Sequence, residues 1–198
     1  IGVAVLVVII AISNVIGTAN SMNRNEHTAE TQLSNVQVVM QRRADLIPNL
    51  VSAVAGSQAQ EQKIYGAIAD ARTKYYNASS SYKNANSADE KTSALEKQQS
   101  ALNIMVGSIK ENYPNIESND QMKTLMAQIE GTENRISVER QKYNNLVNEY
   151  NIQVTSFPDS IIAGMTNHHQ LKTFTADDSA QSAPKINFNS SSSSSSTK

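Results

Sequence analysis

Apolar side chains recur every seven residues along two long stretches of this chain. The first stretch has the row Leu33, Met40, Ile47 and Val54 with the companion row Val36, Arg43 and Leu50. The second has the row Met122, Ile129, Ile136, Tyr143 and Tyr150 with the companion row Met126, Glu133, Arg140, Val147 and Val154. Paired rows of this spacing are typical of helices that pack along one another as in a coiled coil. Because no alternating strand pattern occurs between Ala19 and Asn151, the sequence predicts an all-α fold.

Polar breaks separate the helical stretches. We expect the second helix to end within 77–81, and a polar stretch to Ser87 follows it. Ser87-Ala88-Asp89-Glu90 then resembles a capping box that opens a third helix. That helix stops at Tyr113-Pro114, and Ser118 opens a fourth. Long helices joined by short links favour antiparallel neighbours, so we expect an antiparallel four-helix bundle.

Pro48 interrupts the first apolar row. Proline is tolerated in the first turn of a helix and breaks a helix interior. We therefore expect a new helix to begin here, with Asp45 as its N-cap. A kinked but continuous helix is the competing interpretation.

The chain begins with an uncharged segment that runs to Asn23 and is followed by Arg24. Residues 1–12 are apolar throughout, and a membrane-spanning helix needs about 20 residues. We expect an uncleaved anchor, because the apolar pattern runs on into the following helix. The alternative is a cleaved secretory signal, for which Thr18-Ala19 offers a weak cleavage site. Since the first residue is Ile1 rather than Met, we also expect residues to have been trimmed upstream.

Charge and cysteine content restrict the classes of partner and site. The 198 residues contain 17 Lys and Arg against 18 Asp and Glu, for a formal net charge of -1. That balance lacks the basic surface of a general nucleic-acid binder, so we expect no nucleic-acid partner. The absence of cysteine excludes disulfides and thiolate metal sites.

The segment Gln41-Arg42-Arg43-Ala44-Asp45-Leu46-Ile47-Pro48-Asn49-Leu50-Val51 places two arginines and an aspartate inside an apolar helical pattern. It resembles the run R-R-x-D-L-I-P-N-L-V of the LemA family, where that run follows an N-terminal membrane helix. Further matches occur in the same order at Glu133-Asn134-Arg135-Ile136, Arg140, Tyr143-Asn144, Val147, Tyr150-Asn151, Ser156-Phe157-Pro158, Ile161-Ile162-Ala163-Gly164 and Ala183-Pro184-Lys185-Ile186-Asn187-Phe188. The resemblance covers most of the chain from Thr31 to Phe188 and departs from the family in 85–112 and in the terminal serines. It implies a membrane-anchored four-helix bundle.

Charged residues occupy bundle positions where leucine would be expected. A buried charge is costly unless it is paired, so we expect a structural polar cluster that fixes the register of the helices. Its predicted members are Arg42, Arg43, Asp45, Glu133 and Arg140. A recognition or catalytic cluster is the alternative. If Glu133 neutralises Arg42 or Arg43, Glu133→Leu should destabilise the bundle by roughly 3 kcal/mol or more.

The sequence contains little that indicates catalysis or metal binding. The sequence has no glycine-rich phosphate loop, no H-E-x-x-H and no credible Ser/His/Asp arrangement, so we predict no enzyme and no cofactor. His168-His169, with Asp177-Asp178 nearby, lie in a polar segment and are expected to face solvent rather than bind a metal. Tyr143 and Tyr150 have heptad spacing and are expected in the core.

These patterns give three predicted regions: a transmembrane anchor at 1–23, a bundle at 24–165, and a polar C-terminal extension at 166–198. Ile161-Ile162 and Met165 are expected to fold back and dock on the bundle, and a short helix is the alternative. The serines from 190 to 196 lack the apolar area needed to become ordered. The segment Ala183–Phe188, by contrast, is expected to lie in a groove of the bundle or to add to a partner.

The function we predict is that of a scaffold or adaptor for other membrane or envelope proteins, in a single-pass protein of the bacterial cell membrane. Self-association into a homo-oligomer is one alternative, and an envelope hydrolase or metal-dependent enzyme built on Glu133 and His168-His169 is another. Arg24 is the one basic residue close to the end of the anchor. Because Lys and Arg accumulate on the cytoplasmic side of membrane helices, this low positive charge favours a bundle outside the cytoplasm. Descriptions of the family place the short N-terminus outside, which would put the bundle in the cytoplasm instead.

Overall fold

The computed structural model describes residues 1–54, 61–113 and 120–175, and all regular structure in these ranges is helical. The elements are α1 (Gly2–Val54), α2 (Glu61–Asn84), α3 (Ala88–Asn112), α4 (Asp120–Thr155) and α5 (Asp159–Thr166). The predicted all-α class is confirmed.

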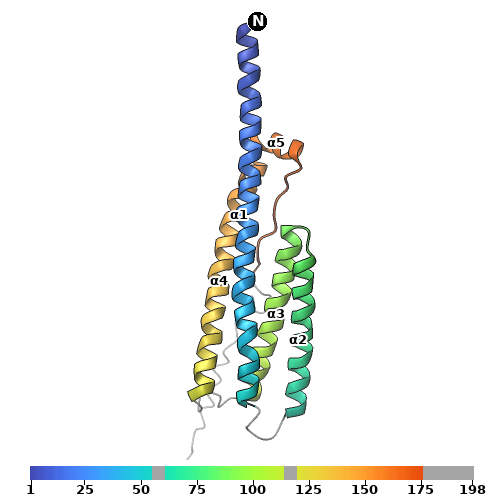
Figure 1. Cartoon of the computed structure of the whole chain (residues 1–198), viewed down its shortest axis with the longest axis vertical. Helices are drawn as coiled ribbons and strands as arrows, with labels where there is room; N and C mark the ends of the chain where they lie inside the picture. The colour runs from blue at the N-terminus through green and yellow to red at the C-terminus, as the bar shows by residue number, and fades with distance from the viewer. Residues whose placement is uncertain (55–60, 114–119, 176–198) are drawn as a thin grey trace, which may run out of the picture.

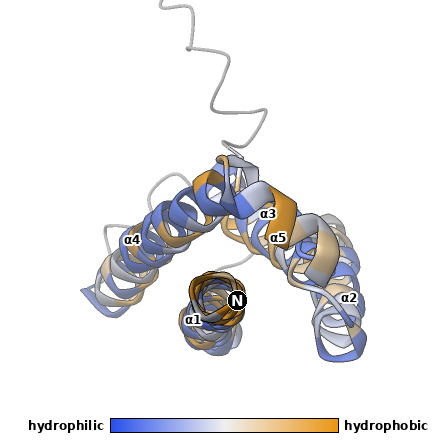
Figure 2. Ribbon diagram, turned by 90° about the horizontal axis from the view of Figure 1, so that it is seen from above, coloured by the Kyte–Doolittle hydropathy of each residue, from blue (hydrophilic) through white to orange (hydrophobic). Residues whose placement is uncertain are grey.

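The four long helices form an antiparallel bundle (Figure 1). In Figure 1 α1 and α3 run downward and α2 and α4 run upward. α1 packs along α4, α2 packs along α3, and a shorter contact between α1 and α3 joins the two pairs. Viewed from above in Figure 2, α1 lies between α4 and α2. The short α5 contacts both α1 and α4 at the upper end of the bundle. Its Ala163 is buried, but Ile161 and Met165 are exposed, so the predicted docking of these two side chains is wrong.

The two heptad rows predicted from the sequence form the centre of the core. The fully buried side chains of α1 include Leu33, Val36, Met40 and Leu50, and those of α4 include Ile136, Tyr143 and Val147. α3 adds Leu95, Leu102 and Ile109. Each helix therefore buries one stripe, which explains why the apolar spacing could be recognised without the structure.

Pro48 lies inside α1, which continues to Val54. The prediction that Asp45 caps a new helix is therefore wrong, and the competing interpretation of a continuous helix is correct. Asp45 instead accepts a side-chain hydrogen bond from Gln41 Nε2 at 2.8 Å. An interior proline costs about 3 kcal/mol. Burial of the neighbouring Ile47 and Leu50, at about 1.5–3 kcal/mol each, is large enough to offset that cost.

The link between α2 and α3 has the predicted Ser87 cap, while Glu90 bonds the residue before the cap rather than Ser87 itself. Ser87 Oγ accepts from the backbone N–H of Glu90 at 3.2 Å, and Glu90 Oε2 accepts from the N–H of Asn86 at 2.8 Å. α3 ends at Asn112, as predicted. α2, however, runs past the predicted stop within 77–81 to Asn84, because Ala78 is buried and Tyr82 packs against the core. The predicted start of the fourth helix, Ser118, lies outside the described residues.

The first part of α1 projects beyond the bundle (Figure 1). Residues 1–17 are exposed, and within the described residues α1 is the one helix long and apolar enough to cross a membrane. Sixteen helical residues from Gly2 to Gly17 extend about 24 Å, close to the roughly 30 Å of a bilayer core. The same helix continues into the bundle without interruption, so the apolar segment and the bundle share one rigid element.

The chain turns back after α5 and runs down the groove between α3 and α4. Asn167 makes the reversal with φ 61°, a left-handed conformation that asparagine tolerates better than most residues. We call residues 167–175 the strap. The predicted polar extension from residue 166 thus begins with a segment that packs on α3 and α4. The remainder of that extension, with Asp177-Asp178, the segment Ala183–Phe188 and the serine run, lies outside the described residues.

Candidate functional site

A buried ion pair joins α1 to α4. Arg43 is 4% exposed, contacts the carboxylate of Glu133 and donates from Nη1 to Asn103 Oδ1 of α3 at 2.9 Å. Burial lowers the pKa of Arg43, and the charge of Glu133 opposes that shift. The carboxylate thus holds a guanidinium cation where three helices meet.

Gln99 of α3 extends this pair into a network. Its Nε2 donates to Glu133 Oε1 at 3.1 Å, and its Oε1 accepts from Arg140 Nη1. Arg140 therefore reaches Glu133 through Gln99 and not directly. Sequence reasoning missed Gln99, although its polar side chain interrupts the apolar stripe of α3 and was a usable signal.

Two predicted members of the structural polar cluster do not take part in this network. Arg42 and Asp45 are exposed, while Arg43 between them is buried. The reason is helical geometry, because neighbouring positions point about 100° apart and only one of them can face the bundle interior. The network consists of Arg43, Glu133, Gln99 and Arg140, and we call these four residues the polar layer. Arg42 is not the partner of Glu133.

Two asparagines of α4 hold the strap by its backbone. Asn144 donates from Nδ2 to the carbonyl of Phe174 at 3.0 Å and accepts from its N–H at 2.9 Å. Asn151 makes the same pair of bonds with Leu171, at 2.9 and 2.8 Å. Seven residues of helix span about 10.5 Å and three residues of extended chain about 10 Å, so the two clamps are in register.

Other side chains fix the strap on both sides. Tyr143 donates to the carbonyl of Lys172 at 3.0 Å and packs edge-on against Phe174, with ring centroids 5.2 Å apart. Lys172 Nζ donates to Glu96 Oε2 of α3 at 2.6 Å. Arg140 lies over the Phe174 ring, 4.7 Å from its centroid, and donates to the carbonyl of Thr175 at 2.6 Å. Arg140 thus connects the polar layer to the strap.

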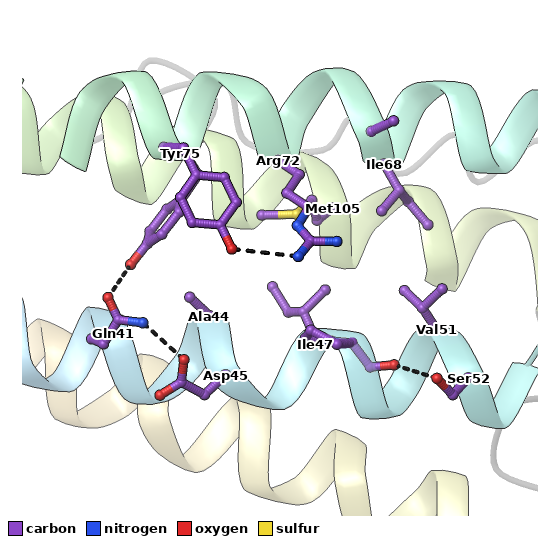
Figure 3. A pocket seen from close by; sticks show the side chains of 13 residues that line it. Gln41, Ala44, Asp45, Ile47, Val51, Ser52, Ile68, Arg72, Tyr75 and Met105 are labelled. Atoms are coloured by element: carbon purple, nitrogen blue, oxygen red, sulfur yellow. Dashed lines mark hydrogen bonds between the residues drawn. The ribbon is translucent and has the colours of Figure 1, made fainter. Parts of the chain in front are cut away.

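The opposite side of the bundle has an unfilled groove between α1 and α2 (Figure 3). Its volume is about 560 Å³. The apolar part of the lining consists of Ala44, Ile47, Pro48 and Val51 from α1, Ile68 and Ala69 from α2, and Met105 from α3. We call this the α1–α2 groove.

The polar groups of the α1–α2 groove bond to one another. Tyr75 donates to Gln41 Oε1 at 3.2 Å, and Gln41 in turn donates to Asp45. Burial, with a smaller effect from the Asp45 charge, raises the pKa of Tyr75 to about 12, so the hydroxyl stays neutral. Arg72 lies over the Tyr76 ring, 5.6 Å from its centroid. The groove therefore offers an apolar floor with an internally bonded polar edge.

Comparison with known proteins identifies the family. The model of the LemA family matches residues 32–188, which is most of the chain. The protein belongs to the LemA family. Its curated relatives include magnetosome proteins MamQ 1 and MamQ 2 of Paramagnetospirillum magneticum, each 26% identical over 190 residues that cover 87% of this chain and 70% of the relative. Magnetosome protein MamQ of Magnetospirillum gryphiswaldense is 24% identical with the same coverage.

The LemA motif residues divide between these two sides of the bundle. Ile47 and Pro48 line the α1–α2 groove, Leu46 is half-buried against the core, and Asn49 is exposed. Tyr143, Asn144 and Asn151 hold the strap, and Tyr150 is fully buried beside Met22. Sequence reasoning missed the strap contacts, which join residues 20 to 30 positions apart through backbone groups.

His168 departs from its predicted exposure to solvent. Its side chain is 6% exposed, Nδ1 lies 2.7 Å from Thr166 Oγ1, and Nε2 lies 3.2 Å from Asn23 Oδ1. His169 is exposed. Across the described ranges no group of three or more His, Asp or Glu side chains is placed to hold a metal ion.

Proposed function

We propose that this LemA-family protein is a membrane-anchored scaffold or adaptor that holds an apolar segment of another membrane or envelope protein in the α1–α2 groove. The observation that carries the proposal is the open, largely apolar groove built on the family motif. Concave apolar sites with a few polar groups at the edge are typical of binding surfaces.

Pro48 gives the groove a further property. Because proline has no N–H, it cannot donate to the carbonyl of Ala44, and both residues line the groove. The missing bond leaves that carbonyl without its usual helical donor. A backbone N–H of an incoming segment could donate to this carbonyl. On the other side of the bundle, asparagine side chains bond the backbone of the strap in a similar way.

Catalysis is not part of the proposal. The carboxylate of Glu133 is engaged by Arg43 and Gln99, whereas His168 packs beside Tyr150. Glu133 and Tyr150 are 17 positions apart on α4, which is about 25 Å along the helix axis. A hydrolase that used Glu133 with His168 would need these groups together, so their separation supports a binding role.

The location we propose is a bilayer crossed once by α1, with the bundle outside the cytoplasm. The low positive charge after the apolar segment supports this orientation. Protease added to intact, wall-stripped cells should digest the bundle. Protection of the bundle until lysis would place it in the cytoplasm.

Site-specific photocrosslinking in intact cells tests the adaptor function. A photoreactive residue at Tyr76, on the edge of the groove, should capture a discrete partner, whereas one at Val138, equally exposed on α4, should not. Ala69→Arg places a charge in the groove at an exposed position and should abolish the capture. Equal capture from both positions would refute the groove as the binding surface, and capture of a second copy would favour self-association.

A further inference from the structure

An exposed apolar stripe lies at the end of the bundle from which the apolar part of α1 emerges. Ile161 and Met165 of α5 are 58% and 75% exposed, and Phe157, one turn earlier, is 83% exposed. Ile161 and Met165 are four positions apart and share a face. Ala163, two positions from each, is on the opposite face and is buried with Met22, Tyr150 and Val154. The stripe therefore points away from the bundle.

The position of α5 along α1 coincides with the end of the apolar segment. Ala163 packs against Met22, and His168 Nε2 lies 3.2 Å from Asn23 Oδ1. The uncharged part of α1 ends at Asn23, directly before Arg24, so this contact lies at its polar end. Figure 1 shows α5 at the upper end of the bundle, and α5 contacts α1 there. The stripe thus sits at the depth of the lipid headgroups.

We propose that residues 157–165 form an interfacial foot that inserts into the boundary between headgroups and acyl chains of the bilayer crossed by α1. This inference rests on the proposed membrane anchoring. Helices that lie in the interface bury their apolar face about 5–10 Å into that boundary. α5 contains no Lys or Arg, so insertion depends on apolar area and does not require anionic lipid.

The foot gives the protein a second point of attachment. A single spanning helix leaves the tilt of the bundle relative to the membrane plane free, whereas a second contact beside it restricts that tilt. Because α5 contacts both α1 and α4, the lipid contact orients both walls of the molecule. The strap starts directly after the foot at Asn167, so the same contact also fixes the upper end of the strap.

Fluorescence quenching in vesicles tests the foot on the full chain. The sequence has no cysteine, so single cysteines at Ile161→Cys and Met165→Cys accept an environment-sensitive label. Vesicles of neutral phosphatidylcholine carry nitroxide-labelled lipids as quenchers. Ile9→Cys, in the span, serves as the positive control, and Val138→Cys, exposed on α4, as the negative control. Helix content by circular dichroism verifies that each variant is folded.

We expect labels at Ile161 and Met165 to be quenched several-fold more than the label at Val138, with no dependence on added anionic lipid. Quenching at the level of Val138 while Ile9 is strongly quenched would overturn the foot and leave the anchor intact. A blue-shifted but unquenched label would show that protein covers the stripe, which also overturns the foot. Loss of quenching at Ile9 as well would show that the anchor proposal itself is wrong.

Discussion

Glu133→Leu is expected to reduce the free energy of unfolding by roughly 3 kcal/mol, because it leaves the Arg43 cation buried without a counter-charge. We take the lower end of the range for broken buried pairs, since Asn103 still accepts from Arg43 and Glu133 itself is 32% exposed. A loss of this size changes the folding equilibrium by about two powers of ten. For a bundle of this length it lowers the melting temperature by about 6–12 °C.

A double-mutant cycle separates the ion pair from other effects of substitution. Arg43→Met leaves a carboxylate that is one-third exposed and can be hydrated, so we expect a smaller loss of about 1–2 kcal/mol. The double variant removes both charges together and should lose less than the sum of the two single variants. Losses that add within about 0.5 kcal/mol would refute the coupling between Arg43 and Glu133.

The cycle is measured by chemical denaturation followed by circular dichroism. A chain that begins at Thr18 is suitable, because residues 1–17 are exposed and contribute nothing to the core. Glu130→Leu is a matched control on the same helix, where the side chain is 61% exposed in its pair with Lys110. Exposed pairs contribute little, so this control should leave stability almost unchanged. A control loss as large as that of Glu133→Leu would show that burial of the charge is not the cause.

Further predictions concern the strap, the tyrosines and the C-terminal segment. Asn144→Ala with Asn151→Ala should release the strap and speed proteolysis after Lys172 and Phe174, at a cost of about 1–2 kcal/mol for each lost clamp, whereas the exposed Asn145→Ala should change neither. Burial raises the pKa of Tyr143 to about 12, above the usual tyrosine value of about 10. The stability that this tyrosine contributes below pH 10 should therefore be lost as the pH rises from about 10 to about 12. Tyr143→Phe should reduce the slope of unfolding midpoint against pH in this range. Deletion of residues 189–198 should leave the melting temperature and partner recovery unchanged, whereas deletion from Ala183 should lower one of them; equal behaviour of both truncations would remove any role for Ala183–Phe188.

The helical stripes could be predicted because each depends on residues of one helix. Leu33, Met40 and Ile136 lie at the positions that a single helix buries whenever it packs on another. The charge of Arg43 could be placed in the core by the same reasoning. Glu133 could be proposed as a partner of Arg42 or Arg43, but Gln99 and Asn103 could not, because they come from α3, whose rotation relative to α1 and α4 the spacing leaves open.

The strap and the continuation of α1 through Pro48 were not predicted, for other reasons. Residues 167–175 have no apolar periodicity, and their attachment depends on backbone groups that every sequence has. The signal lay instead in Asn144 and Asn151, two half-buried amide side chains seven residues apart, each next to a buried tyrosine of α4. Pro48 misled the local interpretation because tertiary packing around Ile47 and Leu50 outweighs the propensity of one residue.

The strap on the α3–α4 side indicates what kind of segment the α1–α2 groove could hold. On the α3–α4 side, an extended segment of the chain is held because paired amide side chains satisfy its backbone groups and Phe174 fills the apolar space. The α1–α2 groove presents apolar space beside Pro48 and a polar edge at Gln41 and Asp45. An extended segment that resembles the strap, with apolar side chains and free backbone groups, is therefore the occupant that we propose for this groove. Because α1 forms one wall and also carries the apolar span, such an occupant would be held at a fixed distance from the membrane.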